Sequence, residues 1–186
     1  AWYPGQAGGL AVADVLFGDF NPSGKLPVTF YKNTDQLPDF EDYSMKNRTY
    51  RYMTEVPLFP FGYGLSYTTF DISKGRLNKK TISAGQDLNF KVNVKNTGKY
   101  DGAEVIQVYV RKVDDAEGPI KSLRAFRRVP LKAGETCVVS IDLLPTTFEF
   151  FDPTTNTMRI MPGKYEIMYG NSSDIPSGNK LSVTLR

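Results

Sequence analysis

The sequence predicts a mainly β fold: an antiparallel β-sandwich of the immunoglobulin or fibronectin type III kind, preceded by the remnant of an α/β sandwich domain. Short runs of alternating apolar and polar residues recur at steady spacing over roughly the last 115 residues, with turn signals between them. The chain holds 13% aromatic residues, 16 glycines and 12 prolines. A composition of this kind is typical of many short strands joined by many turns.

Residues 1–31 are expected to contain one helix and one short strand. Apolar residues recur at helical spacing over 8–17, and Gly18 stands where a helix would end. A turn at 21–24 then leads into a strand over 25–30. One helix and one strand cannot bury both their faces, so we expect this region to be the C-terminal remnant of an α/β domain. The other strands of that domain would lie elsewhere, and the chain is interpreted as truncated.

Residues 32–69 are polar, irregular and rich in aromatic rings. A loop of this length is uncommon in a compact domain unless it packs on another body. We therefore predict a linker arm that joins two domains and is anchored by its rings, each contributing about 1.5–3 kcal/mol if fully buried. These rings belong to Tyr50, Tyr52, Phe59, Phe61, Tyr63 and Tyr67.

Residues 70–186 are expected to form the sandwich domain, with seven or eight strands. Cys137 is the single cysteine, which excludes an intrachain disulfide, and its position in an alternating strand predicts a buried thiol that acts as a small hydrophobe. No Cys-Trp-Cys framework of the antibody type is present. The expected strands cover 88–94, 103–110, 123–131, 137–143, 148–151, 159–161, 165–169 and 181–185.

Composition excludes several classes of function. The 23 basic and 20 acidic residues nearly balance at a formal net charge of +3, whereas a dedicated nucleic-acid binder needs a concentrated basic face. No apolar run approaches the roughly 18 residues of a membrane-spanning helix. The sequence contains no histidine, which removes Ser-His-Asp mechanisms, histidine-ligated zinc and histidine proton shuttles.

The acidic residues do not predict a site. Glycosidic and proteolytic sites often need two carboxylates, but acids adjacent in sequence point in divergent directions, and no set has the spacing of a calcium loop. The glycines at 62 and 64 lack the lysine and helix of a phosphate loop. We expect no catalytic, cofactor-binding or metal-binding residue in this sequence, and no cofactor. The carboxylates considered are Asp14, Asp19, Glu41, Asp42, Asp114, Asp115 and Glu117.

Two basic clusters have alternative interpretations. The first could be a nucleic-acid or carbohydrate patch, but arginines stacked on tyrosines at a domain junction are the favoured reading. The second could protect an edge strand of the sandwich. The clusters are Arg48, Tyr50, Arg51 and Tyr52, and Lys121, Arg124, Arg127 and Arg128. Asn47 and Asn171 begin glycosylation sequons, which carry meaning only outside bacteria.

Motifs along the whole chain resemble glycoside hydrolase family 3, in that family's order and spacing. The first set resembles the end of the family's second domain, the second set the linker, and the third set a fibronectin type III-like third domain. They are WYPGQAGG (2–9), ADVLFGD (13–19) and NPSGKLPVTF (21–30); RTYRY (48–52) and PFGYGLSYTTF (60–70); and LRAFRRV (123–129), GET (134–136), PGKY (162–165) and GNSS (170–173).

The resemblance implies a parent enzyme with a (β/α)8-type barrel, an α/β sandwich and this C-terminal module. Such enzymes are retaining, exo-acting β-glycosidases that remove terminal β-linked glucose or xylose through two carboxylates about 5–5.5 Å apart. The resemblance places the family's nucleophile and its acid/base before this sequence, so no catalytic residue is carried over. Ala7 departs from the glutamate that members often show after Gln6, and the acidic arm at 39–43 is a cue toward xylosidase-like members.

The same resemblance implies that the segment packs on the barrel and α/β domains of its parent and meets a β-linked oligosaccharide only through that parent. It implies a periplasmic or secreted protein without nucleic-acid or membrane partners. An autonomous carbohydrate-binding or adhesion sandwich is the alternative. That alternative would require a flat row of exposed aromatic residues on one sheet face. Trp2, the only tryptophan, cannot contribute to such a row because it lies outside the predicted sandwich. A third reading, a catalytic site within this segment, has no residues to support it.

Overall fold

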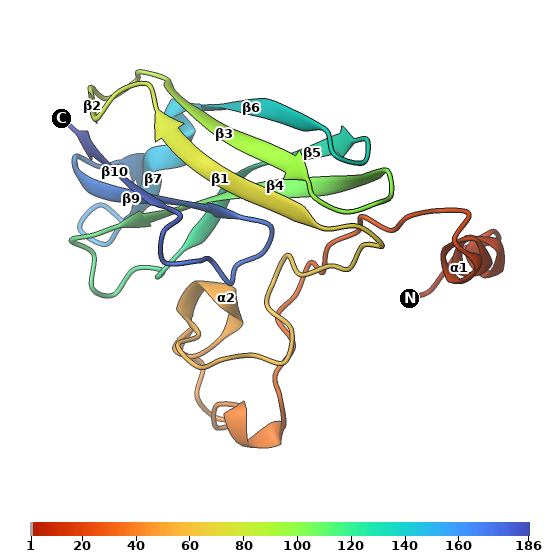
Figure 1. Cartoon of the computed structure of the whole chain (residues 1–186). Coiled ribbons are helices and arrows are strands. Elements are labelled where there is room, and N and C mark those ends of the chain that lie inside the picture. Colours follow the sequence, from red (N-terminus) through yellow and green to blue (C-terminus); the bar gives the residue numbers. More distant parts are fainter. Residues whose placement is uncertain (1) are drawn as a thin grey trace.

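The computed structural model describes residues 2–186 and shows a two-layer β-sandwich with the N-terminal third of the chain along one side (Figure 1). One layer is a three-stranded sheet of order β1-β3-β6, formed by Phe70–Leu77, Leu88–Asn96 and Thr136–Leu143. The other is a five-stranded sheet of order β2-β10-β9-β4-β5, formed by Thr81–Ile82, Lys180–Leu185, Gly163–Gly170, Gly102–Lys112 and Ser122–Leu131. The predicted sandwich is confirmed.

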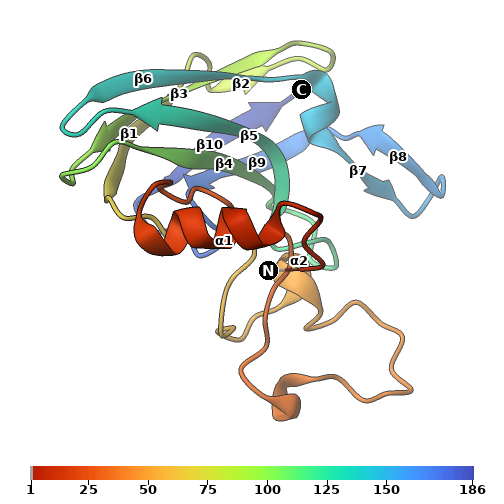
Figure 2. The ribbon, with the colours of Figure 1, turned by 90° about the vertical axis from the view of Figure 1, so that its right-hand side faces the viewer.

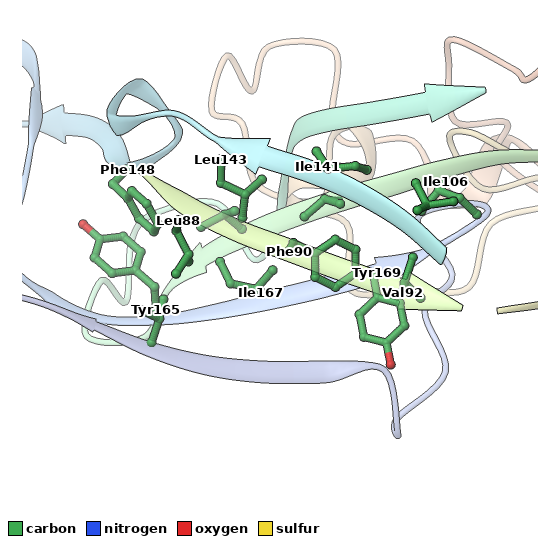
Figure 3. Packing of buried hydrophobic residues seen from close by; sticks show 14 of the residues in the cluster. Leu88, Phe90, Val92, Ile106, Ile141, Leu143, Phe148, Tyr165, Ile167 and Tyr169 are labelled. Atoms are coloured by element: carbon green, nitrogen blue, oxygen red, sulfur yellow. The ribbon is translucent and has the colours of Figure 1, made fainter. Parts of the chain in front are cut away.

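Alternation along the strands builds the core between the two layers. In β3, Leu88, Phe90, Val92 and Val94 are fully buried, while the residues between them are half-buried or exposed. They join the buried side chains of the five-stranded sheet in one apolar cluster (Figure 3). The ring of Phe90 lies 5.1 Å from that of Tyr169 on β9, so aromatic contacts join the two layers directly.

A third, two-stranded sheet extends from one end of the sandwich (Figure 2). The short helix η2 (Pro145–Phe148) leads into β7 (Glu149–Asp152), which pairs antiparallel with β8 (Thr157–Ile160). Phe148 is buried against Tyr165, with ring centroids 5.1 Å apart. The expected strand pair around 152–156 is confirmed.

Three sequence-based expectations differ from the structure. The strand expected over 25–30 does not form, and the segment has only an isolated bridge between Phe30 and Phe59. Pro27 has no N–H to donate to a ladder, which favours this irregular pairing. Strands β1 and β2 were not predicted, and β1 contains a register shift between Ser73 and Arg76 that breaks its alternation. Cys137 is half-buried against the core rather than buried, and desolvation raises its pKa.

The N-terminal region contains the predicted helix α1 (Gly8–Phe17), which ends at Gly18 in the left-handed conformation, φ 85°. None of its residues is buried. The arm is irregular apart from η1 (Thr34–Gln36) and the single helical turn α2 (Thr49–Tyr52). Among residues 2–186, no helix is long and apolar enough to cross a membrane. The domain boundaries at residues 31 and 69 stay a prediction.

Candidate functional site

A set of polar contacts joins residues 20–67 to the sandwich, and we call it the junction. At its centre the Lys25 Nζ lies 2.6 Å from the Glu104 Oε1, with side chains only 13% and 8% exposed. The Glu104 Oε2 also accepts a hydrogen bond of 3.0 Å from the Asn171 Nδ2. Forming an ion pair that is withdrawn from water in this way costs free energy unless both charged groups have good hydrogen-bond geometry. The pair therefore favours one specific arrangement of the Lys25 segment on the sandwich.

Gln107, which is buried, makes the second connection between the arm and the sandwich. The Gln107 Nε2 donates to the carbonyl oxygens of Gly62 (3.0 Å) and Asn171 (2.7 Å), and its Oε1 accepts from the Tyr109 hydroxyl at 2.5 Å. Burial raises the pKa of Tyr109 far above its usual range, so this hydroxyl stays a donor. Gly62 has φ 78°, and a Cβ at this position would collide with the Gln107 amide.

Two of the predicted aromatic anchors fasten the arm to the sandwich. Tyr50 stacks on Phe61 with ring centroids 4.2 Å apart and meets Tyr109 edge-on at 5.7 Å. The Tyr50 hydroxyl accepts a hydrogen bond from the Leu123 N–H at 3.0 Å, and the Ser173 N–H donates to the Phe61 carbonyl at 2.8 Å. The anchoring role expected of Tyr50 and Phe61 is therefore confirmed.

Two other rings, those of Phe59 and Tyr67, bind the arm to the first 31 residues instead. Phe59 stacks on Tyr63 at 5.3 Å and meets Phe30 edge-on at 6.3 Å. The Tyr67 hydroxyl donates to the Val15 carbonyl of α1 at 2.5 Å. The arm thus holds both the sandwich and the N-terminal segment, as a linker between two bodies would.

A cavity of about 840 Å³ opens between the arm and the sandwich. Lys121 lines it and donates to the Ser173 carbonyl at 2.5 Å, while burial lowers its pKa. Glu55, also in the lining, accepts a hydrogen bond from the Gln36 Nε2 at 2.9 Å. These polar side chains hold the arm in place. Their contacts are those of a structural connection rather than those of paired acid and base groups.

The carboxylates singled out from the sequence do not form one site, although Asp115 and Glu117 of the same loop line one small cavity. Asp42 accepts from the Ser44 N–H of its own loop, which lowers the pKa of its carboxyl. Asp114 accepts from the Lys112 Nζ at 2.7 Å, which also lowers its pKa. In the part of the chain that the structure describes, residues 2–186, no group of three or more cysteine, aspartate or glutamate side chains could hold a metal ion.

The first basic cluster does not form one patch. The Arg48 Nε donates to the Ser44 carbonyl and so holds the acidic loop. The Arg51 guanidinium lies 5.7 Å from the centre of the Tyr52 ring, as expected for an arginine stacked at a junction.

The second basic cluster binds neighbouring parts of the chain. Arg127 donates to the Ser140 carbonyl of β6 at 2.9 Å, and Arg128 to the Ser23 hydroxyl at 3.1 Å. Both lie on β5, which is the edge strand of the five-stranded sheet as predicted. Of the two sequon asparagines, Asn171 already uses its amide nitrogen on Glu104.

Sequence reasoning missed the junction residues Lys25, Glu104, Gln107 and Asn171. One signal was available, because Glu104 and Gln107 are polar residues in the otherwise apolar run of 103–110. Polar residues on a strand covered on both faces require hydrogen-bond partners. The identity of those partners was not readable, since Lys25 and Glu104 lie 79 positions apart in the sequence.

Comparison with known proteins agrees with this arrangement. The glycosyl hydrolase family 3 C-terminal domain matches residues 1–67, and a fibronectin type III-like domain matches residues 104–173. A xylan 1,4-β-xylosidase from Xylanibacter ruminicola is 57% identical over 100% of this chain. The chain belongs to glycosyl hydrolase family 3. It spans 21% of the length of that xylosidase, and thus corresponds to a portion of such a family 3 protein.

Several β-glucosidases match in sequence and in structure. A periplasmic β-glucosidase from Salmonella typhimurium is 39% identical over 92% of this chain, which spans 24% of that protein. A β-glucosidase structure from Erythrobacter marinus superimposes with a TM-score of 0.83 at 38% identity, covering 99% of this chain and 24% of that one. A family 3 β-glucosidase from Bifidobacterium adolescentis gives 0.83 at 34% identity, covering 99% and 29%.

Proposed function

We propose that this chain is the C-terminal structural portion of a retaining, exo-acting β-glycosidase that removes terminal β-linked glucose or xylose from oligosaccharides. The portion itself would hold neither the nucleophile nor the acid/base. The single observation that carries the structural role is the junction, in which the Lys25–Glu104 pair and the Gln107 contacts join the family 3 segment to the sandwich. A joint built in this way positions bodies relative to one another and needs no reacting group. The activity of the parent is inferred from the β-xylosidase and β-glucosidase relatives.

The partners follow from the same proposal. Residues 1–31 would complete an α/β domain, residues 32–69 would be the arm, and residues 70–186 would be a sandwich that braces the barrel and α/β domains. The exposed apolar side chains of α1, among them Leu16 at 73% and Phe17 at 85%, support a covering neighbour. The substrate is a β-linked oligosaccharide met by the parent, with no nucleic-acid or membrane partner. The periplasmic relative supports a periplasmic or secreted location.

The test compares three proteins on aryl β-xyloside and aryl β-glucoside. The first is this chain alone, the second is the Xylanibacter xylosidase without its corresponding region, and the third is that xylosidase with this chain fused in place of its own region. We expect hydrolysis by the fusion only. Turnover by this chain alone, lost on neutralising one of its carboxylates, would place a catalytic site here and refute the proposal. A truncated xylosidase as active as the fusion would refute the structural role.

A further inference from the structure

We propose that the cavity between the β7–β8 hairpin and the 113–121 loop binds one pyranose ring of a β-linked oligosaccharide. The cavity has a volume of about 230 Å³, and we call it the hairpin pocket. Its lining combines an apolar wall on the hairpin with a charged wall from α2, the loop and β5. The residues that carry the argument are Phe151, Met158, Arg51, Arg124, Asp115 and Glu117.

The apolar wall is exposed and held on a braced hairpin. Phe151 and Met158 are direct cross-strand partners, so their side chains lie together on one face. They are 52% and 56% exposed, whereas the neighbouring Phe150 is buried in the core. Asp152 braces the turn by accepting hydrogen bonds from the Thr154 N–H and hydroxyl. A flat aromatic surface presented in this way suits the apolar C–H face of a sugar ring.

The charged wall supplies both hydrogen-bond donors and hydrogen-bond acceptors. Asp115 and Glu117 offer carboxylate oxygens, and Arg51 and Arg124 offer guanidinium N–H groups. Arg124 is fixed by its bond to the Glu149 carbonyl at 2.6 Å and by its place 4.9 Å from the Phe150 ring centre. Two positive and two negative side chains balance, so the pocket favours a neutral ligand with many hydroxyl groups over an anion or a cation.

The size of the pocket limits the ligand to about one ring. Its volume lies below the roughly 300–1,000 Å³ typical of drug-sized ligands. Phe151 and Met158 are about half exposed, so the pocket is open to solvent on this side and the rest of a linear oligosaccharide can extend away. This inference goes beyond the structural role proposed above and does not depend on it, because binding is measured on this chain alone.

The test is a titration of the ¹⁵N-labelled chain with xylotetraose and, separately, with cellotetraose, followed by amide chemical shifts. We expect saturable shifts confined to the hairpin, the 113–121 loop and α2, and the sugar that binds more tightly identifies the pentose or hexose preference. Phe151→Ala should weaken binding about threefold to tenfold. Phe126→Ala is the matched control, since Phe126 is an exposed aromatic residue of the same sandwich, 69% exposed, that lies outside the pocket lining. It should leave the affinity unchanged.

A second variant tests the charged wall. Glu117→Gln keeps the shape of an exposed side chain and weakens its acceptor, so it should also reduce affinity while the amide spectrum stays that of the folded chain. The absence of saturable shifts with both sugars would overturn the proposal, as would shifts confined to another surface. Equal losses for Phe151→Ala and Phe126→Ala would also overturn it. None of these outcomes changes the hydrolysis expected of the fused xylosidase, so the two proposals fail separately.

Discussion

At the scale of single residues, the junction depends on a few buried polar groups that satisfy one another. Glu104 accepts from Lys25, Asn171 and the Val105 N–H, so its carboxylate oxygens are shared among three donors. Gln107 uses both ends of its amide, donating to Gly62 and accepting from Tyr109. A buried network that is fully bonded specifies a unique arrangement, whereas one missing partner leaves a costly unpaired group.

Removing the lysine of the ion pair should show how much stability is lost when one partner of the network is missing. Lys25→Met leaves the Glu104 carboxylate buried without its cation, and we expect the free energy of unfolding to fall by about 3–5 kcal/mol. The double variant Lys25→Met/Glu104→Gln removes both charges and keeps an acceptor for Asn171, so its loss should be smaller than that of the single variant. Urea unfolding of the three proteins measures both quantities. A double variant less stable than Lys25→Met would contradict this account.

Gly62 and Gly85 form a matched pair for the close approach of the arm. Both have positive φ, 78° and 84°, but a Cβ at Gly62 would meet Gln107 while one at Gly85 would meet nothing within 4 Å. Gly85→Ala should cost about 1–2 kcal/mol from backbone strain alone. Gly62→Ala should cost a further 1–3 kcal/mol or so, because the Gln107 side chain must move. Equal losses in the free energy of unfolding, measured in urea, would show that the arm does not closely approach the sheet at Gly62.

At the scale of elements, prediction from sequence succeeded where a regular period was present. Alternation over 88–94 and helical spacing over 8–17 correspond to β3 and α1, since each reflects one continuous repeat. Strand β1 was not predicted because its bulge places Lys74 at φ 56° and interrupts the alternation of apolar and polar residues. The 25–30 segment reads as a strand by composition, yet its partner is the arm rather than a sheet. The junction was missed for a related reason, because its contacts join residues far apart in sequence and have no local period.

Helix α1 should be much less protected than the core strands of the sandwich. It has 10 residues and none is buried, and an isolated helix of that length is marginal in water. Its amide hydrogens should exchange many times faster than those of β4, whose central residues are buried. Hydrogen exchange with mass spectrometry compares the two elements directly. Equal protection of α1 and β4 would contradict the expectation.

The β7–β8 turn should respond to acid through Asp152. Hydrogen bonds from Thr154, with a contribution from Arg159, hold the pKa of the Asp152 carboxyl below its usual range. A lowered pKa in the folded state means that the stabilisation is present above about pH 4 and is lost as the pH falls through the folded pKa. The Thr154 amide resonance should titrate with a midpoint below about 4. A midpoint at or above that value would show that these bonds do not favour the ionised form.

At the scale of the whole molecule, apolar exposure is uneven. The sandwich encloses one continuous core, while the first 67 residues leave many large side chains in solvent. Trp2 is 67% exposed, Tyr3 fully exposed and Phe40 94% exposed, in addition to the apolar residues of α1. Exposed apolar surface on this scale marks a region that another body covers. The segment with the family 3 match is also the segment with this exposure, as expected of part of a larger domain.

The chain by itself should therefore associate through α1 as its concentration rises. Leu10 is 67% and Leu16 is 73% exposed, and burying them between copies removes apolar surface from water. Light scattering should show a mass that increases with concentration, and Leu10→Glu/Leu16→Glu should restore a monomer because it places charges on that surface. Val138→Glu is the control, since Val138 is 55% exposed but lies on β6 of the sandwich, and it should not change the association. A chain that stays monomeric at every concentration would show that the helix surface is not adhesive, and the case for a covering domain at α1 would weaken with it.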